Sequence, residues 1–226
     1  QQHPAVEDKA SLRLEVLAEQ AWERSWMSDF KAIKFGKRLW VCPRWQEPPE
    51  PDAINIMLDP GLAFGSGSHA TTRLCLQWLE QNISNESYVI DYGCGSGILA
   101  IAAALLGAHR VIAIDNDPQA ITATIDNAQR NRIPSGLIET YLPEQLPEGI
   151  ASRQADILLA NILAEPLMQL AENFSLLVRP QGQLVLSGIL AEQVDPLLEH
   201  YKQWFTMDKA VLSGDWGRLT GNRKQI

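Results

Sequence analysis

The chain has few cysteines and no long apolar run. Its 226 residues include Cys42, Cys75 and Cys94, and no two of them form a C-x-x-C pair. This spacing argues against a disulfide framework and against a metal site, and it predicts a reducing compartment, the cytoplasm. No apolar stretch reaches the length of a membrane-spanning helix, and no secretion signal opens the sequence. We therefore expect no membrane partner.

Basic residues are in the minority. The sequence has 19 Lys and Arg against 27 Asp and Glu, a formal net charge of −8. An acidic surface argues against direct nucleic-acid binding and leaves room for a basic partner. With 46% hydrophobic residues, the chain can bury the core of one large α/β domain plus a short extra segment.

One stretch, VIDYGCGSGILAIAAALLGA from Val89 to Ala108, organises the rest. Residues that favour strands precede three alternating glycines, Gly93, Gly95 and Gly97, and an Ala/Leu/Ile run follows at once. This order predicts a strand, a glycine turn and a buried helix. Such a turn lets a nucleotide ligand lie against the main chain, facing the free N–H groups at the start of the helix.

The spacing of the stretch indicates which nucleotide it holds. A dinucleotide motif, G-x-G-x-x-G, would need glycine at position 98, where the chain has Ile98. Asp115 ends the next predicted strand, where a carboxylate can accept both ribose hydroxyls. Asp91 adds a second carboxylate beside the turn, which suits the ammonium and sulfonium of S-adenosylmethionine better than the pyrophosphate of NAD. The alternative is that the glycines merely pack the helix on the strand.

The rest of the chain alternates strands with helices. This pattern predicts an α/β fold: a doubly wound, seven-stranded, mostly parallel sheet of the Rossmann-like class I type, with an antiparallel C-terminal strand. Before it, leucines and tryptophans from Ser11 to Phe30 predict one or two amphipathic helices. A short strand from Arg38 to Cys42 and another from Ile54 could pair as a hairpin in front of the main sheet.

Two further segments contain candidate site residues. A flexible loop from Gly65 to Ser68 leads into a helix opened by His69 to Thr72, and it could form a lid over the ligand; the alternative is that the threonines only satisfy free N–H groups of the first turn. Asn161 is the first polar residue after a later predicted strand. It would face the reacting methyl group or, alternatively, cap the next helix.

At these residues the chain resembles the class I S-adenosylmethionine-dependent methyltransferases, and more closely the bacterial ribosomal protein L11 methyltransferase family. The resemblance implies a soluble, cytoplasmic enzyme that transfers methyl groups to the N-terminal amine and lysines of this basic, large-subunit ribosomal protein. Carried over residue by residue, it places the family's cofactor contacts on Thr72, Gly93, Asp115 and Asn161, with Phe64 and Asp91 as neighbours. We take these residues together with Gly95 and Gly97 of the turn as the candidate cofactor-binding residues, and Asn161 as the candidate catalytic residue. The stretches that carry the resemblance are WERSWMSDFKAIKFGKRLWVCPRW, LDPGLAFGSGSHATTRLCLQWL, VIDYGCGSGILAIAA, AIDNDPQAI, ANILAEPL and LSGILAEQ.

The sequence departs from the family's pattern in two places. It reads HATT where a proline usually follows the histidine, and it begins at or after the end of the family's small substrate-recruiting domain. We expect residues 1–52 to be a linker helix and short strand region, and residues 53–226 to be the catalytic domain of a monomer. The alternatives are a methyltransferase of another protein or of a small molecule, and a noncatalytic cofactor-binding module.

Overall fold

The computed structural model describes residues 31–58, 69–147, 149–150 and 154–225. The chain divides into two compact units, of which Ala32–Ile226 contains both sheets described below. The helical segment predicted between Ser11 and Phe30 lies outside the described residues. The functional boundary predicted between residues 52 and 53 stays a prediction, although residues 32–52 share a compact unit with the large sheet.

A small three-stranded sheet begins the described chain. Strand β1 (Ile33–Phe35) pairs antiparallel with β2 (Leu39–Cys42), and β2 pairs parallel with β3 (Ile54–Met57). The hairpin predicted between the second and third of these strands is therefore wrong. The intervening prolines and turns carry the chain back to the start of β2, so that β3 runs alongside it in the same direction, and β1 forms the hairpin instead.

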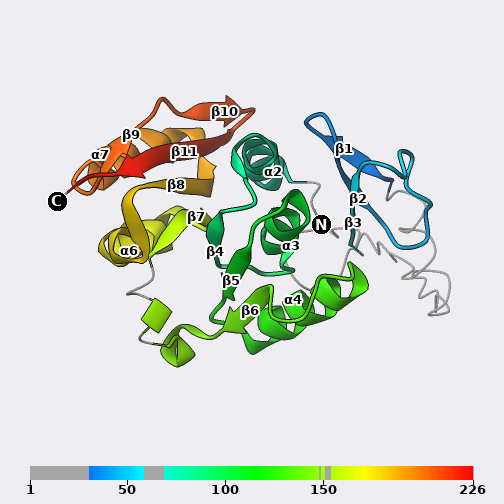
Figure 1. Ribbon diagram of the computed structural model, residues 1–226. Helices are drawn as coiled ribbons and strands as arrows, with labels where there is room; N and C mark the ends of the chain where they lie inside the picture. Colours follow the sequence, from blue (N-terminus) through cyan, green and yellow to red (C-terminus); the bar gives the residue numbers. More distant parts are fainter. Residues whose placement is uncertain (1–30, 59–68, 148, 151–153, 226) are drawn as a thin grey trace, which may run out of the picture. The chain divides into compact units, whose positions relative to one another are not determined.

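The large sheet has eight strands, one more than predicted. The path runs β10-β11-β8-β7-β4-β5-β6, and β9 pairs with β11 beside it (Figure 1). The five strands from β8 to β6 are parallel, and β11 is antiparallel to β8. Two short strands near the C-terminus, β9 and β10, both pair with β11 and bring the number to eight. The strands are β4 (Tyr88–Tyr92), β5 (Arg110–Ile114), β6 (Ile138–Tyr141), β7 (Ala155–Asn161), β8 (Val178–Leu190), β9 (Phe205–Met207), β10 (Val211–Ser213) and β11 (Trp216–Arg223).

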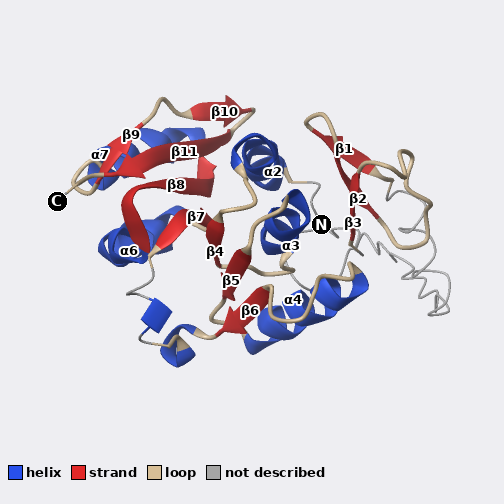
Figure 2. Ribbon diagram, viewed as in Figure 1, coloured by secondary structure: helices blue, strands red, loops and turns tan. Residues whose placement is uncertain are grey.

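Helices cover both faces of this sheet, as a doubly wound fold requires (Figure 2). On one face, α2, α3 and α4 pack over Val89 and Val111; on the other, α6 and α7 pack over Ile90 and Ile112. Neighbouring residues of one strand thus point into different cores, because side chains alternate along a strand. The helices are α2 (Ala70–Asn82), α3 (Ile98–Leu106), α4 (Pro118–Arg130), α6 (Ala164–Leu177) and α7 (Val194–Tyr201), with 3-10 turns at Pro143–Gln145 and Ala191–Gln193.

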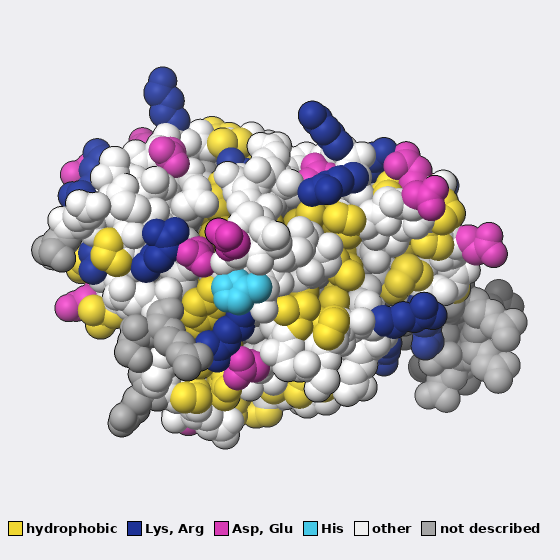
Figure 3. Space-filling model, in the orientation of Figure 1, with side chains coloured by type: hydrophobic (Ala, Val, Ile, Leu, Met, Phe, Trp, Pro, Cys, Tyr) yellow, Lys and Arg dark blue, Asp and Glu magenta, His cyan; other side chains and the backbone are white. Residues whose placement is uncertain are grey.

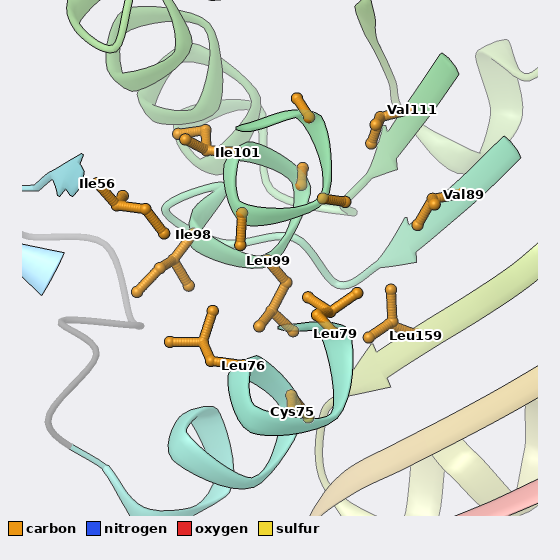
Figure 4. Packing of buried hydrophobic residues seen from close by; sticks show 14 of the residues in the cluster. Ile56, Cys75, Leu76, Leu79, Val89, Ile98, Leu99, Ile101, Val111 and Leu159 are labelled. Carbon is orange, nitrogen blue, oxygen red and sulfur yellow. The ribbon is translucent and has the colours of Figure 1, made fainter. Parts of the chain in front are cut away.

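Helix α3 is apolar all round because it lies between the sheet and other helices. Its residues from Ile98 to Ala104 are buried, and Figure 4 shows Ile98, Leu99 and Ile101 among side chains from α2, β3 and the sheet. The glycine turn is therefore followed directly by a helix whose residues from Ile98 to Ala104 are all buried. Nearby cysteines are buried free thiols, as are all three in the chain.

The topology brings the predicted site residues to one edge. Strand β4 lies between β5 and β7, and all three run in the same direction. The chain continues from β4 to β5 and β6 on one side of β4 and then crosses to β7 on the other, so the strand order reverses between β4 and β7; this is the switch point where α/β sheets bind ligands. The turn after β4, Asp115 after β5 and Asn161 at the end of β7 consequently share the carboxyl edge of the sheet.

The carboxylate of Glu80 helps to attach the small sheet to α2. Glu80, in the last turn of α2, accepts hydrogen bonds from the backbone N–H groups of Lys37 (2.8 Å), Arg38 (2.6 Å) and Leu39 (3.1 Å). Gly36 is also required there, since a Cβ at that position would lie 1.8 Å from a Glu80 oxygen. The β1–β2 turn is therefore shaped around this side chain.

We expect Glu80→Ala to lower the free energy of unfolding by about 2 kcal/mol, because three main-chain donors lose a charged acceptor. Urea titration followed by circular dichroism measures the change. Gln81→Ala, at the exposed neighbouring position of α2, is the matched control and should be close to neutral. Equal stability of the two variants would contradict the anchoring role.

Candidate functional site

The glycine turn after β4 has the backbone conformation that its sequence predicted. Gly93, Gly95 and Gly97 have φ values of 80°, 54° and 78°, a region that other L residues rarely adopt. The N–H groups of Gly93 and Cys94 both donate to the carbonyl of Ile114, at 2.7 and 3.0 Å. The turn is thus fixed to the end of β5, directly beside Asp115.

Two of these glycines are also required by packing. A Cβ on Gly93 would lie 2.2 Å from Cγ2 of Ile162, and a Cβ on Gly97 would lie 2.8 Å from the side chain of Thr124 in α4. The packing interpretation of the motif therefore holds for Gly93 and Gly97. This packing is compatible with ligand binding, because close contacts beneath the turn hold the outer surface of the turn in place.

Asp115 has a partly exposed carboxylate at the carboxyl end of β5. Its Oδ2 accepts from the N–H of Gly95 at 2.8 Å, and its Oδ1 accepts from the N–H of Asp117 at 3.0 Å. A carboxylate has about four lone-pair positions, so two stay available after these bonds. Asp115 is therefore held in a fixed orientation while it can still accept from a ribose.

Asp91 is buried beneath the turn and is only 1% exposed. Its Oδ2 accepts from the N–H of Ala100 at 2.9 Å, which joins β4 to the first turn of α3, while its Oδ1 has no hydrogen-bond partner. Burial raises the pKa of Asp91 to about 7; the Ala100 bond opposes this shift and the Asp115 carboxylate adds to it. This location gives Asp91 a supporting role under the turn, and its direct contact with a cofactor stays a prediction.

Helix α2 brings Thr72 to the end of β7. The Nδ2 of Asn161 donates to Oγ1 of Thr72 at 3.4 Å, and Oδ1 of Asn161 is buried without a partner. The first turn of α2 is capped by His69, whose Nδ1 lies 2.8 Å from the Thr71 hydroxyl. Thr72 is therefore free of any capping role and holds the Asn161 amide instead.

Asn161 does not cap the following helix. The N-cap residue of α6 is Leu163, and it makes no side-chain capping bond. The capping alternative considered for Asn161 is thus wrong. Ile162, the next residue, lies against Gly93 on one side, and its backbone lies against Gly188 on the other, where a Cβ would come within 2.4 Å of its carbonyl oxygen.

One feature of the site was not predicted. His69, recognised as part of the loop before α2, packs edge-to-face on Trp216 of β11 with ring centroids 4.4 Å apart. No local sequence signal could show this contact, because the two residues are far apart in the chain. Phe64 and the predicted lid, residues Gly65–Ser68, lie outside the described residues.

These residues fit S-adenosylmethionine. The turn presents main-chain atoms without side chains, Asp115 is oriented with spare acceptor positions, and Asn161 has a buried acceptor that lacks a donor. Within the described ranges, no group of three or more His, Cys, Asp or Glu could hold a metal ion, and no helix is long and apolar enough to cross a membrane.

Comparison with known proteins decides the family. The model of the ribosomal protein L11 methyltransferase (PrmA) family matches residues 1–224. The chain belongs to this family. Curated relatives named ribosomal protein L11 methyltransferase include one from Cellvibrio japonicus, 53% identical over 91% of this chain and 69% of the relative. Another, from Aliivibrio fischeri, is 51% identical over 97% of this chain and 73% of the relative.

Solved structures agree with this family assignment. A ribosomal protein L11 methylase from Lactobacillus delbrueckii subsp. bulgaricus superposes with a TM-score of 0.75 at 33% identity, covering 87% of this chain and all of that one. An RNA methyltransferase from Salinibacter ruber, solved with S-adenosyl-L-homocysteine, shares the fold alone (TM-score 0.54, 16% identity, 67% of this chain and 91% of that one). This L11 methyltransferase family member is an S-adenosylmethionine-dependent methyltransferase.

The raised pKa of Asp91 predicts how stability depends on pH. Between about pH 4 and pH 7 the folded protein holds a proton that the unfolded chain has lost, so the free energy of unfolding falls as pH rises through that window. The slope is at most about 1.4 kcal/mol per pH unit, and the effect levels off above pH 7.

We expect Asp91→Asn to lack this contribution, because a neutral amide cannot titrate and its oxygen can still accept from Ala100. The difference in unfolding free energy, variant minus wild type, should grow from pH 5 to pH 7. Urea titrations at pH 5, 6, 7 and 8 measure it. A difference that stays constant over this range would show that Asp91 does not titrate as described.

Proposed function

We propose that the chain transfers methyl groups to amino groups of ribosomal protein L11, namely its N-terminal amine and lysines. The family match carries the choice of L11, and the Asn161 amide supports an amine as the methyl acceptor. Thr72 fixes its nitrogen, and its oxygen is a buried acceptor without a donor. An acceptor in this state costs about 1–3 kcal/mol, and the N–H of a substrate amine is a group that would satisfy it. The name shared by the curated relatives supports the choice of substrate.

The reaction makes modest chemical demands on the protein. S-adenosylmethionine, when bound, supplies a methyl group on a positively charged sulfur, which is already activated for displacement. The chain has to align the amine and keep its lone pair unprotonated. A lysine has a reference pKa of about 10.4 and an α-amine one of about 7.7–8.0, so an apolar surrounding that disfavours the charged form helps most for lysine.

The residues after β7 provide such surroundings. Ile162 is half-buried against the glycine turn, and Leu163 is 71% exposed at the start of α6. Both residues directly follow Asn161 in the chain, so a substrate amine that reached the Asn161 oxygen would lie close to them. We infer that Asn161 orients the amine as the catalytic residue, and that Ile162 and Leu163 reduce its hydration.

The cofactor would be held on the other side of Asn161. Asp115 would accept the ribose hydroxyls, and the turn of Gly93, Gly95 and Gly97 would contact the ligand through main-chain atoms. Thr72 and Asn161 would complete the site. We propose roles for Phe64 and Asp91 as neighbours, Asp91 through its support of the turn.

Surface charge supports a protein partner. In Figure 3, the described Lys and Arg side chains lie scattered over the face drawn, with Asp and Glu among them, and no basic patch appears on that face. The net charge of −8 suits a basic protein better than a nucleic acid. We further propose that the protein acts in the cytoplasm as a monomer.

Asp115→Asn should weaken S-adenosylmethionine binding by about 1.5–3 kcal/mol, because the ribose would lose a charged acceptor. Isothermal titration calorimetry measures this, with NAD as the ligand that should not bind. Asp126→Asn, an exposed carboxylate on α4, should leave the affinity unchanged. An unaltered affinity of the Asp115 variant would place the ribose elsewhere, and binding of NAD alone would overturn the cofactor assignment.

Asn161→Ala should slow methyl transfer to L11 about 10- to 100-fold at saturating S-adenosylmethionine, because the amine loses its orienting acceptor. Mass spectrometry of L11 over time measures transfer. Asn161→Asp keeps an oxygen and should retain more activity, and Asn173→Ala on the exposed face of α6 is the control. Transfer at the wild-type rate by Asn161→Ala would refute the role of Asn161. If the wild-type chain leaves L11 unmodified even at L11 concentrations high enough to make recruitment by a further domain unnecessary, the proposed substrate is wrong.

A further inference from the structure

A groove lies between α6 and α7, beyond the residues that the proposed mechanism uses. Its volume is about 690 Å³, and its lining includes Ala164, Glu165 and Met168 of α6, Glu192 of the 3-10 turn after β8, and Pro196 and Leu197 of α7. We call it the α6–α7 groove. Most of its lining area is apolar, with carboxylates at two positions.

The groove opens at the same edge of the sheet as the candidate site. Helix α6 begins three residues after Asn161, and the 3-10 turn begins directly after β8, the strand next to β7. Glu165 is four residues from Asn161, so their Cα atoms lie within about 14 Å of each other even if the chain between them were fully extended. A peptide in the groove is therefore within a few residues of the reacting amine.

The groove combines exposed apolar atoms with carboxylates that lack basic partners. Met168 is 36% exposed, and Leu163, beside the groove, is the most exposed large hydrophobic residue among those described. Glu165 and Glu192 are both exposed, and neither makes an ion pair within the described part of the chain. Methionine adapts to different neighbours, which suits a surface that accepts more than one sequence.

We propose that the α6–α7 groove binds the segment of the protein substrate that flanks the acceptor amine, and that this segment is basic and partly apolar. The inference rests on the proposed function and adds the surface that selects among amines. Charge complementarity carries it: Glu165 and Glu192 attract a lysine-rich peptide and repel a phosphate backbone. The partly exposed Met168 would contact the stems of lysine side chains, which are themselves apolar.

Glu165 also has a structural effect, because a carboxylate in the first turn of α6 interacts favourably with the helix dipole. That effect would appear in the stability of the protein and leave substrate affinity unchanged. A test of the groove must therefore separate KM for the protein substrate from both stability and cofactor affinity.

The principal variant is Glu165→Gln with Glu192→Gln. Its control is Glu172→Gln with Glu199→Gln, which removes the same charge from exposed positions of α6 and α7 outside the groove lining, although Glu199 also loses an exposed ion pair with Lys202. Steady-state methylation of L11 by the full chain should show KM raised about three- to tenfold for the groove variant, with kcat and calorimetric affinity for S-adenosylmethionine unchanged. The control should stay within twofold of wild type.

A second pair of variants tests the apolar part. Met168→Gln should raise KM about threefold, whereas Leu176→Gln, an exposed apolar residue farther along α6, should not. Thermal unfolding of all variants by circular dichroism identifies any loss of fold. A groove variant with the KM of its control, or with lowered cofactor affinity, would overturn the proposal.

Direct binding separates this proposal from the proposed function. Calorimetry with an oligolysine peptide should detect binding to wild type that Glu165→Gln with Glu192→Gln weakens at least threefold, whether or not L11 is the substrate. An RNA oligonucleotide of equal length should not bind. Binding of the RNA in preference to the peptide, or equal peptide binding by both proteins, would overturn the groove assignment even if L11 is methylated.

Discussion

The candidate site depends on the close approach of three strand ends around Ile162. Gly93 after β4 and Gly188 within β8 both leave room for this residue, and a Cβ at either position would overlap it. Both glycines also have positive φ values, so another side chain would be strained there in any case. This contact sets the position of Asn161, the preceding residue, relative to the glycine turn. The proposed alignment of amine and methyl group depends on that position.

Burial of the Asp91 carboxylate beneath the turn is unfavourable for folding. Desolvation disfavours its charged form, and only one of its oxygens has a donor. Replacing it by an apolar residue would remove that cost and also the bond to Ala100, which fixes the start of α3 to the end of β4. Asp91 therefore lowers the local stability but holds the N-terminus of α3 beneath the turn. Buried groups with shifted pKa values are common where ligands bind.

Local signals in the sequence predicted the elements that depend on neighbouring residues. The alternation of glycines from Gly93 to Gly97 predicted a turn between a strand and a buried helix, and the structure has this turn, with positive φ values at all three glycines. Asp115 could be placed because it directly follows a buried strand. The partner of Thr72 could not be derived from its own surroundings, since Asn161 lies 89 positions away and the bond forms only when α2 packs over the end of β7. The same reason explains the missed contact of His69 with Trp216.

The predicted pairing of β2 and β3 as a hairpin was wrong for a related reason. The segments at Leu39–Cys42 and Ile54–Met57 each have strand-forming residues, but their relative direction is set by Glu80 and by the side chain of Asn131. That asparagine bonds both the N–H and the carbonyl of Met57, at 2.7 and 2.9 Å. Glu80 lies in α2, and Asn131 is the C-cap residue of α4. The direction of β3 thus follows from tertiary contacts that cannot be inferred from the sequences of the two strands alone.

Helix α2 connects the small sheet with the candidate site. Its first turn contains Thr72, which holds Asn161, and its last turn contains Glu80, which holds the β1–β2 turn. A 13-residue helix packed through Leu76 and Leu79 is stiff on this scale, so its two ends move together. The small sheet and Asn161, the residue proposed to orient the amine, are therefore both attached to α2. The α6–α7 groove lies against the other face of the sheet, so the proposed recognition surface and the Thr72–Asn161 contact depend on different helices.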